Sequence, residues 1–149
     1  MGAELHALGT NAPLWAALAG WFGAQFIKMV RSLIATHRLD LSYFVSSGGM
    51  PSAHSALVTA LATAVGRSQG LGSPIFAIAV IFASIVMYDA AGVRLAVSMQ
   101  ARVLNHMLDD FFHERGIQPK RLREFIGHTP REVLVGAAVG ILIGVLFTL

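Results

Sequence analysis

The fold is decided at two short stretches, Gly49-Met50-Pro51-Ser52-Ala53-His54 and Gly127-His128-Thr129-Pro130-Arg131-Glu132. Each places a histidine close to a proline at the start of an apolar segment. Proline is favoured in the first turn of a helix, where its missing N–H costs nothing, and the free backbone N–H groups there attract anions. Each stretch is therefore a candidate half of a phosphate site.

The composition indicates an integral membrane protein. Hydrophobic residues make up 55% of the 149 residues and charged residues 13%, and the mean hydropathy is +0.65, well above that of an average soluble domain. This length predicts one domain, residues 1–149, with about four membrane spans. Because the chain contains no cysteine, disulfides, thiolate metal sites and cysteine nucleophiles are excluded.

The apolar segments predict an all-α membrane bundle of about four short transmembrane helices. The expected spans cover residues 12–34, 51–66, 74–93 and 132–149. A segment of roughly 17 residues covers only about 25 Å, so the bilayer is expected to thin locally. Lys28 and Arg31 lie in the last third of the first span, which must therefore end at headgroups or at a wet cavity.

Residues 95–115 are predicted to form an amphipathic helix at the membrane interface. Apolar residues recur there at steps of three and four, at Val97, Ala101, Leu104, Leu108 and Phe111, which is typical of an interfacial helix. A further three residues share one helical face and resemble a metal site, although we interpret them as a solvated face: His106, Asp110 and His113. No metal is predicted.

Small residues repeat at four-residue spacing on two of the spans. They are Gly136, Gly140 and Gly144 on the fourth, and Ala56, Ala60 and Ala64 on the second. Such stripes favour close helix packing in lipid.

The basic residues predict the orientation in the membrane. With four spans, ten of the eleven lysines and arginines lie on the face that also holds His54 and His128, and Arg67 alone lies on the other. By the positive-inside rule this face is cytoplasmic and both termini are on the opposite side. We expect a bacterial inner membrane or a thylakoid-type membrane.

Three motifs together resemble a known family. Pro51-Ser52-Ala53-His54 is similar to the Pro-Ser-Gly-His motif of the type 2 phosphatidic acid phosphatase and vanadium haloperoxidase superfamily. The run from His128 to Gly136 resembles its His-x-Pro-x-Asp-Val-Leu-x-Gly segment. With Tyr88-Asp89-Ala90-Ala91-Gly92-Val93-Arg94, the order of motifs resembles the small divergent branch of that superfamily.

The resemblance implies metal-independent hydrolysis of a lipid phosphate or diphosphate through a phosphohistidine. It implies that His128 is the nucleophile, that Glu132 accepts from the other ring nitrogen, and that His54 protonates the leaving oxygen. The phosphoryl oxygens are then held by the side chains or backbone of Lys28, Arg38, Ser52, Ala53 and Arg94. Fixed cations and N–H donors suit a transition state whose negative charge spreads over the equatorial oxygens.

The chain departs from the family pattern at three points, which leaves some roles open. Ala53 replaces the usual glycine. Arg31 and Arg38 compete for the arginine of the first motif. Arg121 or Arg123 competes with Arg94 for that of the third.

Three residues also have structural interpretations. Glu132 completes a capping box with Thr129, Ser52 is a helix N-cap, and Asp89 is placed to pair with Arg94. Capping by Glu132 is compatible with orientation of His128.

Two other functions remain open from the sequence. One is a non-catalytic membrane protein that binds lipid phosphate headgroups, and the other is a small transporter or flippase. The expected partners are a lipid phosphate substrate and membrane lipids, not nucleic acid. Four short spans bury little surface, which is consistent with a homodimer.

Overall fold

The computed structural model describes residues 1–37, 49–113, 122 and 127–149. In this part of the chain every regular element is a helix and no strand occurs, which confirms the all-α prediction. The six helices are α1 (Gly2–Gly9), α2 (Ala12–Thr36), α3 (Ala53–Gln69), α4 (Pro74–Ala91), α5 (Val93–His113) and α6 (Pro130–Phe147).

Helices α2, α3, α4 and α6 each begin at a polar N-cap residue, where the sequence changes from polar to apolar. The side-chain oxygens of Asn11, Ser52, Ser73 and Thr129 each accept an N–H from the first turn of α2, α3, α4 and α6. At α6 the capping box is complete, with the Glu132 side chain bound to the backbone N–H of Thr129. These caps satisfy N–H groups that have no partner within the helix.

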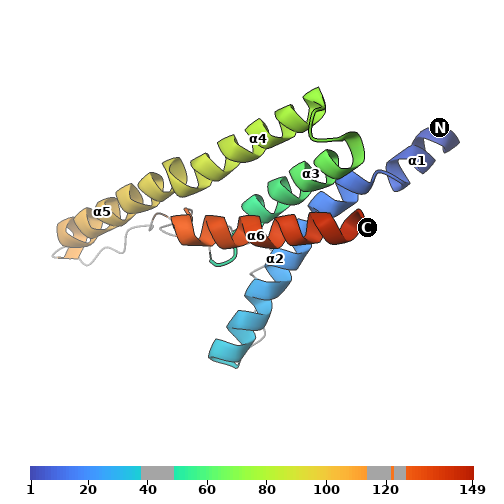
Figure 1. Ribbon diagram of the computed structural model, residues 1–149. Helices are drawn as coiled ribbons and strands as arrows, with labels where there is room; N and C mark the ends of the chain where they lie inside the picture. Colours follow the sequence, from blue (N-terminus) through green and yellow to red (C-terminus); the bar gives the residue numbers. More distant parts are fainter. Residues whose placement is uncertain (38–48, 114–121, 123–126) are drawn as a thin grey trace.

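Helix α3 is the centre of the bundle and contacts α2, α4 and α6 (Figure 1). The predicted stripe of small residues forms its contact with α6. A methyl group on Gly140 would collide with the backbone of Ala56, and one on Gly144 would lie 2.8 Å from the carbonyl oxygen of Ala60. Because these positions are glycine, the two helix backbones can approach closely.

Two helices are long and apolar enough to cross a membrane. Within the described residues these are the continuous helical stretch Pro74–Asp109, which combines α4 and most of α5, and α6. Helix α4 also turns large apolar side chains away from the bundle, among them Ile78, Ile81 and Ile85, each more than half exposed. That α2 and α3 also cross the membrane stays a prediction.

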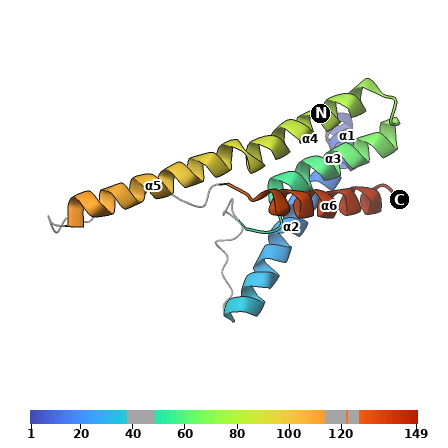
Figure 2. The same ribbon diagram turned by 60° about the vertical axis from the view of Figure 1, so that its left-hand side comes forward.

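The two ends of the bundle differ. Both termini lie at the end where α3 turns into α4, whereas the starts of α3 and α6 lie at the other end with the junction of α4 and α5 (Figures 1 and 2). The positions of these ends agree with the predicted order of helices, whereas four membrane spans stay a prediction. This arrangement brings the two proline-histidine stretches to one end.

Helix α5 continues α4 nearly in line, so the two helices form one rod that leaves the bundle (Figures 1 and 2). It therefore does not turn across the end of the bundle. Its bounds, Val93–His113, are close to the predicted 95–115. A position at the membrane interface stays a prediction.

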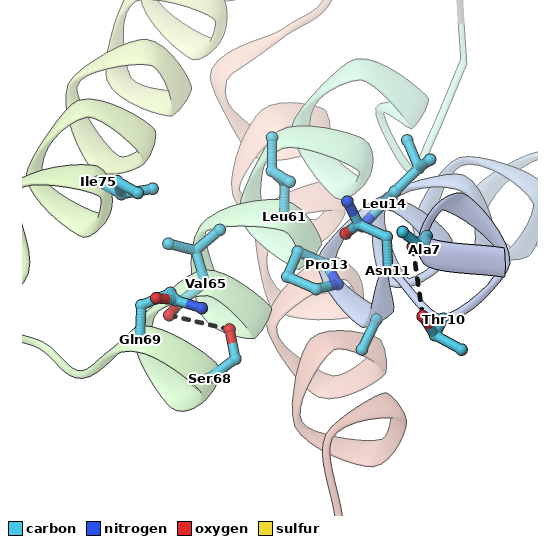
Figure 3. A pocket seen from close by; sticks show the side chains of 11 residues that line it. Ala7, Thr10, Asn11, Pro13, Leu14, Leu61, Val65, Ser68, Gln69 and Ile75 are labelled. Carbon is cyan, nitrogen blue, oxygen red and sulfur yellow. Dashed lines mark hydrogen bonds between the residues drawn. The ribbon is translucent and has the colours of Figure 1, made fainter. Parts of the chain in front are cut away.

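One cavity lies at the end of the bundle where both termini are found, and no charged residue lines it. It measures about 690 Å³ and lies between the start of α2, the end of α3 and the start of α4 (Figure 3). Its lining includes Pro13, Leu61, Val65 and Ile75, and the hydroxyl of Ser68 donates to the carbonyl of Val65. Chemistry on a phosphate needs cations and bases, so this cavity is not the candidate site.

Candidate functional site

The segment that carries His128 is fastened to the junction of α4 and α5. The backbone N–H of His128 donates to the carbonyl of Ala90 (3.1 Å), and that of Gly127 donates to the hydroxyl of Ser98 (2.8 Å). A side chain at Gly127 would collide with the backbone of Arg94 and Leu95. The glycine therefore lets the chain pass close to α5, and His128 is left only 1% exposed.

A hydrogen bond and close backbone packing hold the first turns of α3 and α6 side by side. The backbone N–H of Ser52 donates to the carbonyl of Glu132 (3.0 Å), and a methyl group on Gly136 would collide with the carbonyl oxygen of Ser52. Two helix N-termini, each with a partial positive charge, therefore meet at one place. The ring centroids of His54 and His128 are 6.4 Å apart.

Lys28 reaches the same region from α2. Its side chain is 3% exposed, and its Nζ atom has no hydrogen-bond partner among the residues that the structure describes. The charged groups that act on it and on His128 include Glu132. A buried ammonium group without a partner is costly, and an anion bound between Lys28 and the histidines would reduce this cost.

Glu132 has the capping role that the sequence predicts, and its orientation of His128 stays a prediction. Its Oε2 atom accepts the N–H of Thr129 at 2.8 Å, and the same atom lies 3.5 Å from Nδ1 of His128. The second distance is longer than a typical hydrogen bond, so this contact is mainly electrostatic. The carboxylate caps α6 and also lies on the Nδ1 side of the imidazole.

The surroundings of His128 favour its neutral form. Burial lowers its pKa from the ordinary value, and the nearby Lys28 lowers it further, while Glu132 acts in the opposite direction. The unprotonated ring therefore persists to lower pH than in an exposed histidine. Neither ring nitrogen of His128 has a hydrogen-bond partner within the described part of the chain, and an unprotonated ring nitrogen can act as a nucleophile.

Arg94 and Asp89 form the predicted ion pair, with Nε and Oδ2 2.6 Å apart. Both side chains are about two-fifths exposed, at 43% and 40%, so the pair is accessible at the mouth of the site. Both act electrostatically on His54, as does Lys28. Arg94 is therefore part of the electrostatic environment of His54.

The other predicted residues lie around this centre. Ser52 is buried, and its hydroxyl accepts from the N–H and the hydroxyl of Ser55; Ala53, also buried, begins α3. Arg31 is exposed and donates to the carbonyl of Met50 (2.8 Å), and it lines a hollow of about 400 Å³ together with Lys28 and Ser32.

Some candidates of the sequence analysis lie outside the described residues. These are Arg38, Arg121 and Arg123, together with the side chains of Asp110 and His113.

Two residues of α5 that sequence reasoning missed hold the segment before His128. The side chain of Asn105 accepts the N–H of Leu122 and donates to its carbonyl, both at 2.9 Å, while Ser98 accepts from Gly127. Both side chains are at most 5% exposed. The available signal was their spacing of seven residues, which places two small polar side chains on one helical face.

We expect Asn105→Ala to loosen the segment that carries His128. The substitution removes the side-chain partner of the N–H and of the carbonyl of Leu122, and each lost hydrogen bond costs about 0.5–1.5 kcal/mol. Hydrogen exchange of the Gly127 and His128 amides should become faster than in the wild-type protein. His106→Ala, an exposed neighbour on α5, is the matched control, and equal exchange in both variants would contradict this role of Asn105.

Fold and site together define an all-helical integral membrane protein with two histidines, a lysine and an arginine gathered at one end of the bundle. The chain belongs to the Divergent PAP2 family, whose model matches residues 9–143. It is 44% identical over 145 residues to the uncharacterized membrane protein YuiD of Bacillus subtilis strain 168, an alignment that covers 90% of this chain and 92% of the relative. No solved structure matches.

Proposed function

We propose that this chain is a membrane phosphatase that hydrolyses a lipid phosphate or diphosphate through a phosphohistidine at His128, without a metal. The observation that carries the proposal is a pair of buried groups, Lys28 Nζ and His128 Nε2, which have no hydrogen-bond partner among the described residues and lie beside the first turns of α3 and α6. A buried cation beside a buried nucleophile suits a phosphoryl group better than a neutral ligand.

In the first step Nε2 of His128 attacks phosphorus, and the bond from phosphorus to the leaving oxygen breaks. His54 gives its proton to that oxygen, which leaves as the lipid alcohol or, from a diphosphate, as the lipid monophosphate. Lys28 and Arg94 hold the equatorial oxygens, assisted by the N–H of Ala53 and by Ser52 at the start of α3. Glu132 stabilises the positive charge that His128 gains.

In the second step water attacks phosphorus and the bond from phosphorus to nitrogen breaks. The neutral His54 accepts the proton of the water, so both histidines return to their starting state. The net reaction consumes one water and releases inorganic phosphate. The same cationic groups stabilise both transition states, because the charge develops on the same oxygens.

The apolar surroundings support a lipid as substrate. A hollow of about 430 Å³ lies between α3, α4 and α6. Met87, two residues before Asp89, lines one end of it, and Leu71 lines the other end. Phe76, Val80 and Ile141 contribute to it. An acyl or prenyl chain of the substrate would lie there while its phosphate reaches the histidines.

The charge distribution supports a cytoplasmic position of the site in a bacterial inner or thylakoid-type membrane. Lys28, Arg31, Arg94 and Arg131 are all at the end that holds the histidines, whereas Arg67 is at the end of α3, on the other side. This is the asymmetry that the positive-inside rule relates to the cytoplasm.

Phosphate release by the purified full-length protein tests the proposal. The substrates are phosphatidic acid, phosphatidylglycerol phosphate, and polyprenyl phosphate and diphosphate. We expect release from at least one lipid, undiminished by excess EDTA and inhibited by vanadate, which mimics the trigonal-bipyramidal phosphoryl group. Activity that is lost on chelation and restored by a divalent cation would contradict the metal-independent mechanism, and binding without release would favour a headgroup-binding protein.

A further inference from the structure

One side of α5 is held to its own chain, and the other side is exposed in the part of the chain that the structure describes. Among the described helices α5 contacts only α4, and it extends past the end of the bundle (Figures 1 and 2). Ser98, Ala101 and Asn105 are buried, on the side where Ser98 and Asn105 bind Gly127 and Leu122.

The open side carries a continuous stripe of exposed side chains. Five are large and apolar, with exposures between 43% and 62%, and the sixth is an exposed glutamine. In chain order they are Val93, Val97, Gln100, Leu104, Met107 and Phe111. Successive members are four, three, four, three and four residues apart.

This alternation of four and three is the heptad spacing of a coiled coil. Val97, Leu104 and Phe111 then occupy a positions, and Val93, Gln100 and Met107 occupy d positions. Val103, 59% exposed, borders the stripe and widens its apolar part. The stripe contains no charged residue, so two identical copies meet without like-charge repulsion.

We propose that this stripe, which we call the α5 seam, pairs with the α5 seam of a second copy as a parallel two-stranded coiled coil. From the sequence alone, we expected lipid to cover this side of α5. Two observations favour a second copy. Helix α5 points out of the bundle along α4, and Gln100 stands in the middle of the seam, where acyl chains would leave its amide without a partner.

A second copy satisfies Gln100 because the two amides face each other across the twofold axis and hydrogen-bond. A single polar residue at an a position of a coiled coil specifies register and oligomer state, and we propose a similar effect on register for Gln100 at its d position. The seam is short, about 27 Å at 1.5 Å per residue. Copies in one membrane share their orientation and have a high effective concentration, which compensates for the short length.

Cysteine cross-linking tests the proposal in the full-length protein, which has no cysteine of its own. Leu104→Cys and Met107→Cys place a thiol in the seam, while Arg102→Cys and His106→Cys place one elsewhere on α5. In proteoliposomes under mild oxidation, the two seam variants should form disulfide-linked dimers several-fold more than the two controls. Dilution with excess lipid should leave this difference intact.

Equal cross-linking of seam and control variants would overturn the proposal. So would strong quenching of a fluorophore at Leu104→Cys by brominated lipids, because it would show that lipid covers the seam. Within the Leu104→Cys background, Gln100→Lys should reduce the dimer yield by placing two like charges together, and Gln100→Leu should not. These readouts do not depend on catalysis, so they stand apart from the proposed phosphatase activity.

Discussion

His128→Ala is expected to abolish turnover, with a loss of several orders of magnitude. The nucleophile of the proposed reaction is then absent. Removal of a covalent nucleophile affects the transition state and not only substrate binding. The measurement is phosphate release from the best lipid substrate, with the fold checked by circular dichroism and by thermal unfolding.

His54→Ala is the matched variant, since it removes the other histidine of the same pair. It should lose about 10² to 10⁴ in rate on a lipid substrate, the usual contribution of general acid catalysis. A nitrophenyl phosphate, whose leaving group needs little protonation, should recover much of this loss. Retained turnover in His128→Ala, or an equal loss on both substrates in His54→Ala, would show that the two roles are wrongly assigned.

Lys28→Met is the second substitution with a large expected effect. The side chain is buried, and its ammonium group is proposed to hold the phosphoryl oxygens as negative charge develops. Loss of one such stabilising group costs about 10²–10³ in rate. Because this charge is on the phosphoryl group, the loss should be similar for lipid phosphates and for nitrophenyl phosphate, unlike the loss in His54→Ala.

Arg31→Met is the control for Lys28→Met, because Arg31 lies one turn further along α2, is exposed, and already donates to the carbonyl of Met50. We expect a much smaller effect on the rate. Methionine is apolar and of similar length, so Lys28→Met should keep or increase stability, since it removes a buried charge. A stable Lys28→Met protein with wild-type rates would exclude Lys28 from phosphate binding.

Much of the fold could be predicted because its signals are local. Pro74 and Pro130 begin α4 and α6, and the spacing of Gly140 and Gly144 against Ala56 and Ala60 was visible in the sequence. Each of these features depends on one helix and its first turn, or on a simple periodicity. The close contact of α3 with α6 then follows from the size of the residues.

The organisation of α5 could not be predicted in the same way. Its periodicity identified an amphipathic helix, but the pattern alone does not tell which side another segment covers. The polar side carrying Ser98 and Asn105 is buried because the chain returning towards His128 brings backbone groups that need hydrogen-bond partners. The apolar side is left exposed, which is the reverse of the usual expectation for a helix in a globular protein.

The residues of the candidate site could be predicted from the sequence, but their burial and their contacts could not. The motifs identified His54, His128 and Lys28, and the structure brings them to the first turns of α3 and α6. That Lys28 is buried with no partner in the described residues, and that the backbone of His128 is bound to Ala90, depends on contacts between distant segments. Such contacts leave no periodic signal in a single sequence.

The most direct test of the phosphohistidine mechanism is to trap the phosphoenzyme. The protein is mixed with lipid phosphate labelled in its phosphate group, quenched in denaturant at alkaline pH, and analysed for label on the chain by mass spectrometry of its peptides. We predict an alkali-stable, acid-labile phosphate on His128, absent in His128→Ala and present in His54→Ala when the substrate has a good leaving group. Steady turnover with no label on His128, or label that survives in His128→Ala, would contradict the mechanism.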